Sequence, residues 1–135
     1  YDLKAGKPMN IKEFKKTVFP DLERSFRKAT GMDVELEVHW DSLTTEKFDK
    51  DFAEGLKKVY FVPLIAACKN ICRVDEGKRH LKAKLKKVIF RDKDHLTGRD
   101  AYTLADGLLT IDHQVGADVS AVDERIELLT ELLQQ

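Results

Sequence analysis

The sequence predicts an α+β domain: a four-stranded, mainly antiparallel sheet with helices packed on one face, in the order α-β-α-α-β-β-β-α. Apolar residues recur at spacings of three and four in some stretches, as in amphipathic helices, and alternate with polar residues in others, as in strands. The last three strand-like runs are joined by short connections, which favour antiparallel neighbours. The chain has 135 residues, 42% of them hydrophobic, enough for a single core.

Residues 10 to 31 carry the signals of a first helix. Asn10 can cap its start and Glu13 can complete a capping box. A core-facing stripe runs along it, formed by Ile11, Phe14, Val18, Leu22 and Phe26. The stripe passes through Pro20, which either kinks the helix or opens a second one, and it ends at Gly31.

A strand and a long helical stretch come next. Residues 33 to 40, DVELEVHW, alternate strictly between apolar and polar positions and predict a strand. From Phe48 to Cys72 the apolar residues return to helical spacing. Pro63 lies within this stretch, so it either kinks one helix or separates two.

The remaining elements follow from caps and turns. Asp75 can cap a short helix, and a strand is expected over 86–92. An Asp-Gly pair at 106–107, between the β-like runs AYTLA and LLTIDH, predicts a hairpin. The stretch 120–135 predicts a last helix.

Helices on one face of this sheet would leave the other face polar. That face would display eight side chains: Glu35, Glu37, His39, Lys87, Arg91, Thr103, Thr110 and Asp112. Such a face can be solvated, or it can hold a partner or a ligand.

We expect residues 1–8 to be a tag, a linker or a domain junction, and 9–135 to be the single domain. Only two cysteines are present, and no apolar signal-peptide core is seen at the start, so a cytoplasmic setting is favoured. The longest strongly apolar stretch, 59–68, is about half of the ~20 residues that a membrane span needs. The formal net charge is zero, which gives no general attraction to nucleic acid or anionic lipid.

No catalytic, metal or cofactor site is predicted. Cys68 and Cys72 lie on an apolar stripe with only His80 nearby as a third ligand, so they are expected to be buried, inert thiols. The strand alternation puts His39 and His113 on opposite faces, and no nucleophile or phosphate-loop motif occurs. These absences favour a protein that is not an enzyme.

The most basic segment of the chain is 78–93. Six of its side chains are candidates for an interaction surface: Lys78, Arg79, Lys82, Lys86, Lys87 and Arg91. No exposed aromatic residues interleave with them as stacking platforms for bases, which argues against nucleic acid. Acidic residues elsewhere could balance these charges within the fold or across a homo-oligomer.

Three functional hypotheses remain. The first is a small non-catalytic domain that binds another protein, or itself, through the exposed sheet face or the C-terminal helix. The alternative is a ligand-binding or enzymatic pocket between sheet and helices. Its candidate residues are Trp40, Tyr60, Tyr102 and His113. The third is nucleic-acid binding through the basic segment.

Overall fold

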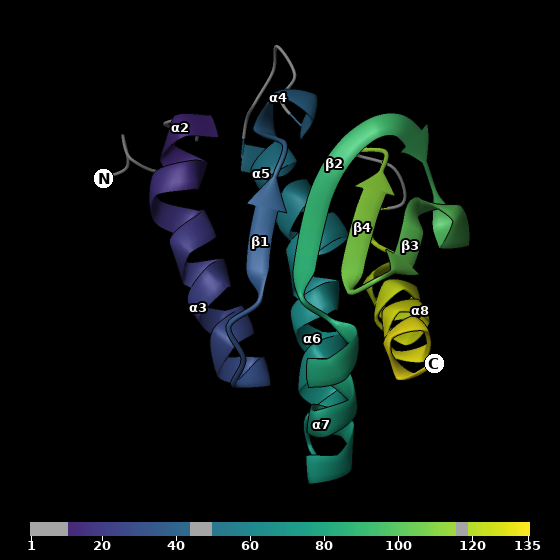
Figure 1. Cartoon of the computed structure of the whole chain (residues 1–135). Helices are drawn as coiled ribbons and strands as arrows, with labels where there is room; N and C mark the ends of the chain where they lie inside the picture. The colour runs from purple at the N-terminus through teal and green to yellow at the C-terminus, as the bar shows by residue number, and fades with distance from the viewer. Residues whose placement is uncertain (1–10, 44–49, 116–118) are drawn as a thin grey trace.

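A computed structural model describes residues 11–43, 50–115 and 119–135, which form helices packed behind a four-stranded sheet (Figure 1). The expected tag at 1–8 and the helix cap at Asn10 lie outside the described residues. Among those that are described, no helix is both long and apolar enough to cross a membrane.

The first helical run is continuous through its proline. It consists of α2 (Ile11–Glu13), the π-helical turn η1 (Phe14–Val18) and α3 (Phe19–Thr30). Pro20 has no N–H to donate and its ring clashes with the carbonyl four residues earlier. The wider π turn just before it, in which Phe19 donates to a carbonyl five residues back, accommodates the ring without ending the helix.

The second helical run deals with Pro63 in the same way. It consists of α5 (Lys50–Leu56), the π-helical turn η2 (Lys57–Phe61) and α6 (Val62–Ile71). Again the proline follows a π turn, and Val62 donates to the carbonyl five residues before it. Each proline is therefore preceded by a wider π-helical turn, and the helix continues past it.

The sheet is mixed, and the prediction of a mainly antiparallel sheet is wrong. Its strands are β1 (Glu35–Val38), β2 (Lys87–Leu96), β3 (Tyr102–Ala105) and β4 (Leu108–His113), in the spatial order β1-β2-β4-β3. The β1–β2 and β2–β4 pairs are parallel, and only β3 and β4 are antiparallel.

Short connections favour a meander in which β2 pairs with β3, and the structure departs from that pattern. The hairpin at Asp106 and Gly107 is confirmed, with φ values of 53° and 83° that suit its tight turn. However, the hairpin presents β4, not β3, to β2. β4 is the more buried strand and takes the central place, whereas β3 exposes Thr103 and Ala105 and lies at the edge.

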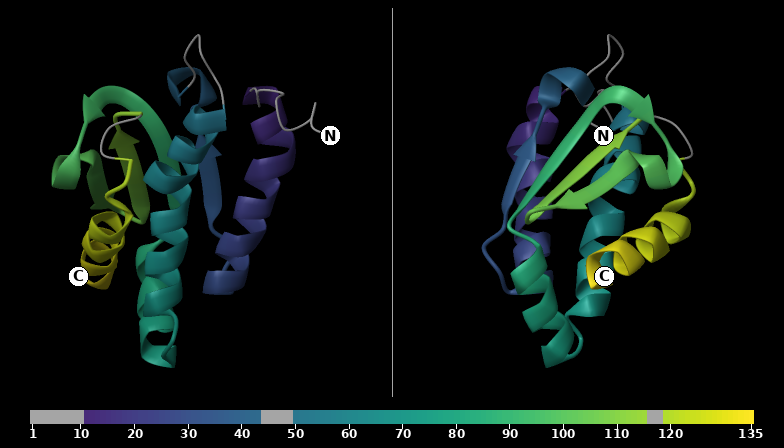
Figure 2. Two further views of the ribbon diagram at one scale, coloured as in Figure 1. Left: turned by 180° about the vertical axis from the view of Figure 1, so that it is seen from behind. Right: turned by 45° about the vertical axis from the view of Figure 1, so that its right-hand side comes forward.

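The remaining helices are α4 (Trp40–Leu43), α7 (Asp75–Lys84), the 3-10 turn η3 (Gly98–Ala101) and α8 (Val122–Gln134). Seen from behind, α6 runs down the middle of the helical layer with α3 and α8 on either side (Figure 2). α6 therefore contacts both flanking helices and is the centre of the core.

The two faces of the sheet differ as expected. The covered face carries fully buried side chains: Val88, Phe90, Leu109 and Ile111. The opposite face carries the expected polar residues, with Glu35 opposite Lys87 and Thr103 opposite Thr110. Asp112 belongs to that face by register but is only 3% exposed, because the end of β2 folds over it.

Candidate ligand site and charged surfaces

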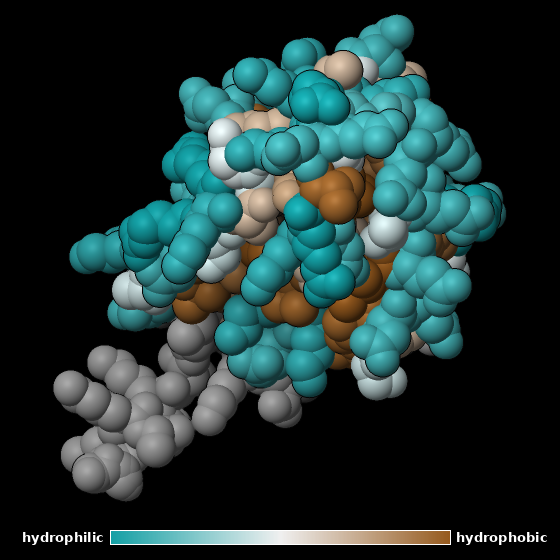
Figure 3. Space-filling model, turned by 90° about the horizontal axis from the view of Figure 1, so that it is seen from below, coloured by the Kyte–Doolittle hydropathy of each residue, from teal (hydrophilic) through white to brown (hydrophobic). Residues whose placement is uncertain are grey.

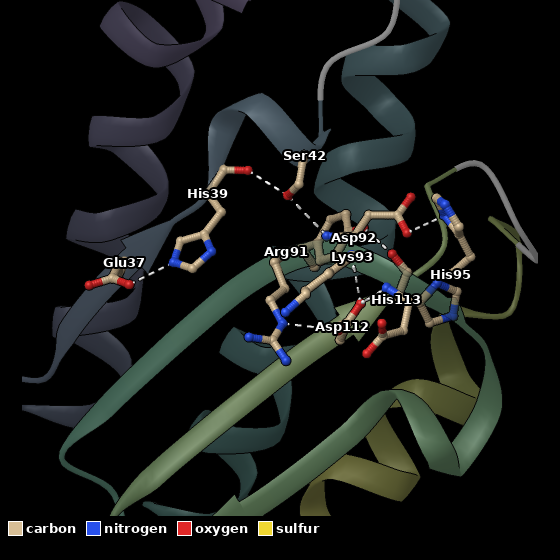
Figure 4. Close-up of polar contacts among 11 residues, drawn as sticks. Glu37, His39, Ser42, Arg91, Asp92, Lys93, His95, Asp112 and His113 are labelled. Atoms are coloured by element: carbon tan, nitrogen blue, oxygen red, sulfur yellow. Dashed lines mark hydrogen bonds and ion pairs between the residues drawn. The ribbon is translucent and has the colours of Figure 1, made fainter.

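Polar side chains gather at the carboxyl ends of β2 and β4, around the carboxylate of Asp112 (Figure 4). Its Oδ1 accepts hydrogen bonds from the backbone amides of Lys93, at 2.9 Å, and Asp94, at 3.2 Å. Its Oδ2 accepts one from Nε of Arg91, at 2.9 Å. Carboxyl ends of parallel strands are where open α/β sheets usually bind ligands, so this cluster is the first place to look.

An irregularity in β2 explains why Asp112 accepts two backbone amides. The register of β2 against β4 jumps between Arg91 and Leu96, so the intervening residues bulge out of the ladder. Asp112 accepts the amides that the bulge leaves unpaired. Burial alone would raise the pKa of Asp112, but the two amides and the guanidinium outweigh it and lower the pKa below its usual value. The simplest role of this carboxylate is structural.

The bulge also brings the imidazole of His95 against the buried carboxylate of Asp92. Nδ1 of His95 lies 2.7 Å from Oδ1 of Asp92, whose Oδ2 accepts the amide of Val115. Such a pair resembles the orienting half of an acid–base site. However, the His95 side chain is 68% exposed and does not line the cavity described below. The pair therefore lacks the enclosed substrate position that a general base needs.

The hydroxyl of Ser42 makes its hydrogen bonds to backbone groups. It donates to the carbonyl of His39 at 2.7 Å and accepts the amide of Asp92 at 3.1 Å. Nε2 of His39 pairs instead with Glu37, at 2.7 Å. Ser42 thus links the end of β1 to β2 and is not set up as a nucleophile, because its proton is held by a carbonyl.

A small cavity of about 90 Å³ opens beside the end of β4 and the first turn of α8. Tyr102 and His113, both candidates from the sequence, line it together with Arg125. Tyr60 lies behind them, fully buried, and its hydroxyl donates to the carbonyl of His113. Burial, followed by the charges of Asp92 and Asp112, raises the pKa of Tyr60.

Trp40, the fourth candidate pocket residue, lies elsewhere. Its ring makes edge contacts with Phe14, at 6.0 Å between ring centroids, and with Phe19, at 5.2 Å. Nζ of Lys15 lies 5.3 Å from the centre of the indole. Trp40 is thus part of an aromatic cluster that packs the first helical run against the core.

The basic segment does not form one surface. Lys87 lies on the sheet face and pairs with Glu35 at 3.1 Å and Glu37 at 2.9 Å, while Arg91 pairs with Asp112. Four of the six candidates lie on α7 or just after it: Lys78, Arg79, Lys82 and Lys86. Fewer charges are therefore free to meet an outside partner than the sequence indicates.

A second group of cations is drawn together only by the fold. Three cations rim a groove whose sides include Ala29, Ile65 and Cys72: Lys28 of α3, Lys69 near the end of α6, and Arg73 in the turn after it. We call this the basic groove. None of its three cations makes an ion pair with another residue that the structure describes. Sequence reasoning missed the groove because its residues are about forty positions apart.

The other flank of α6 is acidic. Asn70 of α6 and the outer face of α8 form a hollow that contains Asp123, Glu127 and Glu131, with Ile126 between them. We call this the acidic hollow. Glu131 makes a loose pair with Arg99 at 3.7 Å, whereas Asp123 and Glu127 have no ion-pair partner within the described ranges.

Both thiols are free. Cys68 is buried in the core, and this burial raises its pKa to about 12. Cys72 is half-buried at the basic groove, where burial raises its pKa and the charge of Lys78 opposes that rise. Neither thiol has the lowered pKa that marks a nucleophile.

Comparison with protein-family models, with curated proteins and with solved structures finds no match for this chain. Nor do the described parts of the chain bring together three or more His, Cys, Asp or Glu side chains as a metal site would require. The features that remain as candidates for function are the two flanks of α6 and the cavity at the end of β4.

Proposed function

We propose that the protein is a non-catalytic domain that associates with itself, the acidic hollow of one copy docking on the basic groove of the next. The observation that motivates this is the charge difference between the two flanks of α6 in a molecule of zero net charge. In Figure 1 these flanks face α3 on one side and α8 on the other.

The charges on the two surfaces match in kind and number. Three cations rim the basic groove, and three carboxylates lie in the acidic hollow. Each surface also offers a half-buried isoleucine, Ile65 in the groove and Ile126 in the hollow. Contact between the two surfaces would thus pair opposite charges around a small apolar centre, the usual arrangement of a protein interface.

The other surfaces offer less. On the exposed sheet face, Lys87 pairs with Glu35 and Glu37, and this internal pairing leaves little charge for a partner. On the lower face of the molecule, apolar surface shows only in patches between hydrophilic side chains (Figure 3). An interface driven mainly by charge suits this surface better than one driven by a broad apolar patch.

The two surfaces lie on opposite flanks of α6, so two copies cannot make both contacts at once and do not close as a two-fold dimer. Such an interface generates rings or open chains. Exposed ion pairs contribute about 0.2–1 kcal/mol each, so three of them supply no more than about 3 kcal/mol. We therefore expect weak association that grows with concentration and disappears as salt is raised.

The test is light scattering with size-exclusion chromatography over a range of protein concentrations. Raising the salt from about 0.01 M to about 1 M shortens the Debye length from about 30 Å to about 3 Å and should return the protein to monomer. The double variant K69E/R73E should stay monomeric. A matched control, K12E/K58E, reverses two exposed lysines outside the groove and should still associate.

Mixing two variants that cannot self-associate gives a sharper test. K69E/R73E keeps its acidic hollow, and D123K/E127K keeps its basic groove. Each should be monomeric alone, and together they should associate, because the intact hollow of one variant can dock on the intact groove of the other. A strict monomer in low salt at high concentration, or mixed variants that do not combine, would refute the proposal.

A further inference from the structure

The cavity beside the end of β4 has the chemistry of a built site. It is bounded by Gly98, Tyr102, His113, Glu124, Arg125 and Leu128. Its polar lining is largely withdrawn from solvent, since Tyr102 is 6% exposed, His113 2% and Arg125 5%. Nη1 of Arg125 donates to the carbonyl of Val119 at 3.4 Å, and a guanidinium carries five N–H donors, so it can also serve an acceptor in the cavity.

The hydroxyl of Tyr102 supplies a second, independent observation. It is buried, and its proton has no acceptor among the described residues. The guanidinium of Arg125 lies near it and opposes the rise in the pKa of Tyr102 that burial causes. A guanidinium can only donate, so it leaves the hydroxyl proton of Tyr102 without an acceptor. Nearly all buried polar groups in folded proteins are satisfied, so an acceptor belongs in the cavity.

The neighbouring groups narrow the choice of that acceptor. Nδ1 of His113 lies 2.8 Å from the carbonyl oxygen of Gln114, which can only accept, so Nδ1 carries a proton and donates to it. Glu124, at the solvent side of α8, repels a doubly charged anion more strongly than a singly charged one. Leu128 adds an apolar wall. One guanidinium with one carboxylate nearby suits a singly charged, planar anion better than a phosphate.

The size of the cavity agrees with a small molecule. At about 30 Å³ for each water-sized group, 90 Å³ holds about three such groups. This is about the size of a carboxylate group that carries one or two further carbons. We propose that this cavity binds a short aliphatic carboxylate, with Arg125 and the Tyr102 hydroxyl donating to its oxygens and Leu128 against its alkyl end. The same position would also accept the carboxylate end of a longer molecule.

The site is tested on the purified chain with propionate as the probe and chloride at equal ionic strength as the reference. A dissociation constant on the order of 1 mM is expected for so small a ligand, so backbone amide resonances are the suitable readout. The amide signals of Gly98, Ala121 and Leu128 should shift saturably with propionate and not with chloride. Acetate should bind similarly, and phosphate at least tenfold more weakly.

Two variants separate binding from folding. Tyr102→Phe removes only the hydroxyl and should weaken propionate binding about tenfold while the melting temperature is unchanged or higher, because an unsatisfied group is lost. Tyr60→Phe removes a hydroxyl outside the cavity lining. It should lower the melting temperature and leave propionate affinity within about twofold.

Three results would overturn the proposal. One is the absence of saturable shifts, which would mean that the cavity holds water only. Another is tighter binding of phosphate than of propionate. The third is unchanged propionate affinity in Tyr102→Phe. Because the cavity is separate from the basic groove, these results leave the self-association proposal standing or falling on its own test.

Discussion

Replacing Asp112 with asparagine tests the central polar contact of the sheet. The side chain keeps its shape and one acceptor oxygen, but it loses its charge and can no longer pair with Arg91. The carboxylate takes part in three hydrogen bonds, two with amides and one with a guanidinium. Hydrogen bonds to a charged group are worth about 1.5–3 kcal/mol and neutral ones about 0.5–1.5 kcal/mol.

A loss of about 1 kcal/mol for each of the three bonds predicts that Asp112→Asn lowers the free energy of unfolding by about 3 kcal/mol. A domain of this size has about 5–15 kcal/mol, so the variant should still fold. With urea slopes of about 1–3 kcal/mol per molar, the unfolding midpoint should fall by about 1–3 M. Asp94→Asn is the matched control, because that exposed carboxylate lies on the same bulge.

The pH dependence follows from the lowered pKa of Asp112. Its folded pKa lies below the ordinary value of 3.8, so the unfolded chain binds the proton more readily. The stabilisation is complete above pH 3.8 and is lost as the pH falls through the lower folded pKa. Asp112→Asn should therefore flatten the loss of stability in acid. An unchanged midpoint, or an equal acid response in both proteins, would refute this account of the bulge.

Two further predictions concern backbone and thiols. Gly107→Ala should cost about 2–4 kcal/mol of unfolding free energy, because φ is +83° and the new Cβ would lie 2.8 Å from Cγ of Lys86. Gly98→Ala, with φ of +63° and open space around it, should cost only about 1–2 kcal/mol, and equal costs would contradict the clash. In alkylation of the folded protein followed by mass spectrometry, Cys72 should react slowly and Cys68 only on unfolding, and equal rates would show that the helix layer opens.

Local signals predicted the elements well. Alternation over 33–40 gave β1, and the Asp-Gly pair gave the hairpin, because both depend on residues that are neighbours in sequence. The order of strands depends on which strand of the hairpin reaches β2. That choice is decided by burial of Leu109 and Ile111 in the finished core, which no local pattern contains.

The charged surfaces illustrate the same limit. The run 78–93 is contiguous in sequence, but the fold divides it between α7 and a sheet face where its charges are neutralised. The basic groove combines Lys28 with Lys69 and Arg73, which meet only because α3 packs on α6. Cations in separate elements look ordinary until tertiary contacts bring them together.

Arg125 is different, because a sequence signal for it did exist. It lies four residues before Leu129 and eight before Leu133, so it belongs to the buried stripe of α8, whereas Ile126 is only half-buried. A charge on a stripe of core leucines costs free energy unless partners surround it. The structure places Arg125 against the cavity, near the unsatisfied hydroxyl of Tyr102. A buried arginine at helical spacing from core leucines is thus a stronger sequence signal for the proposed binding site than the run of surface lysines.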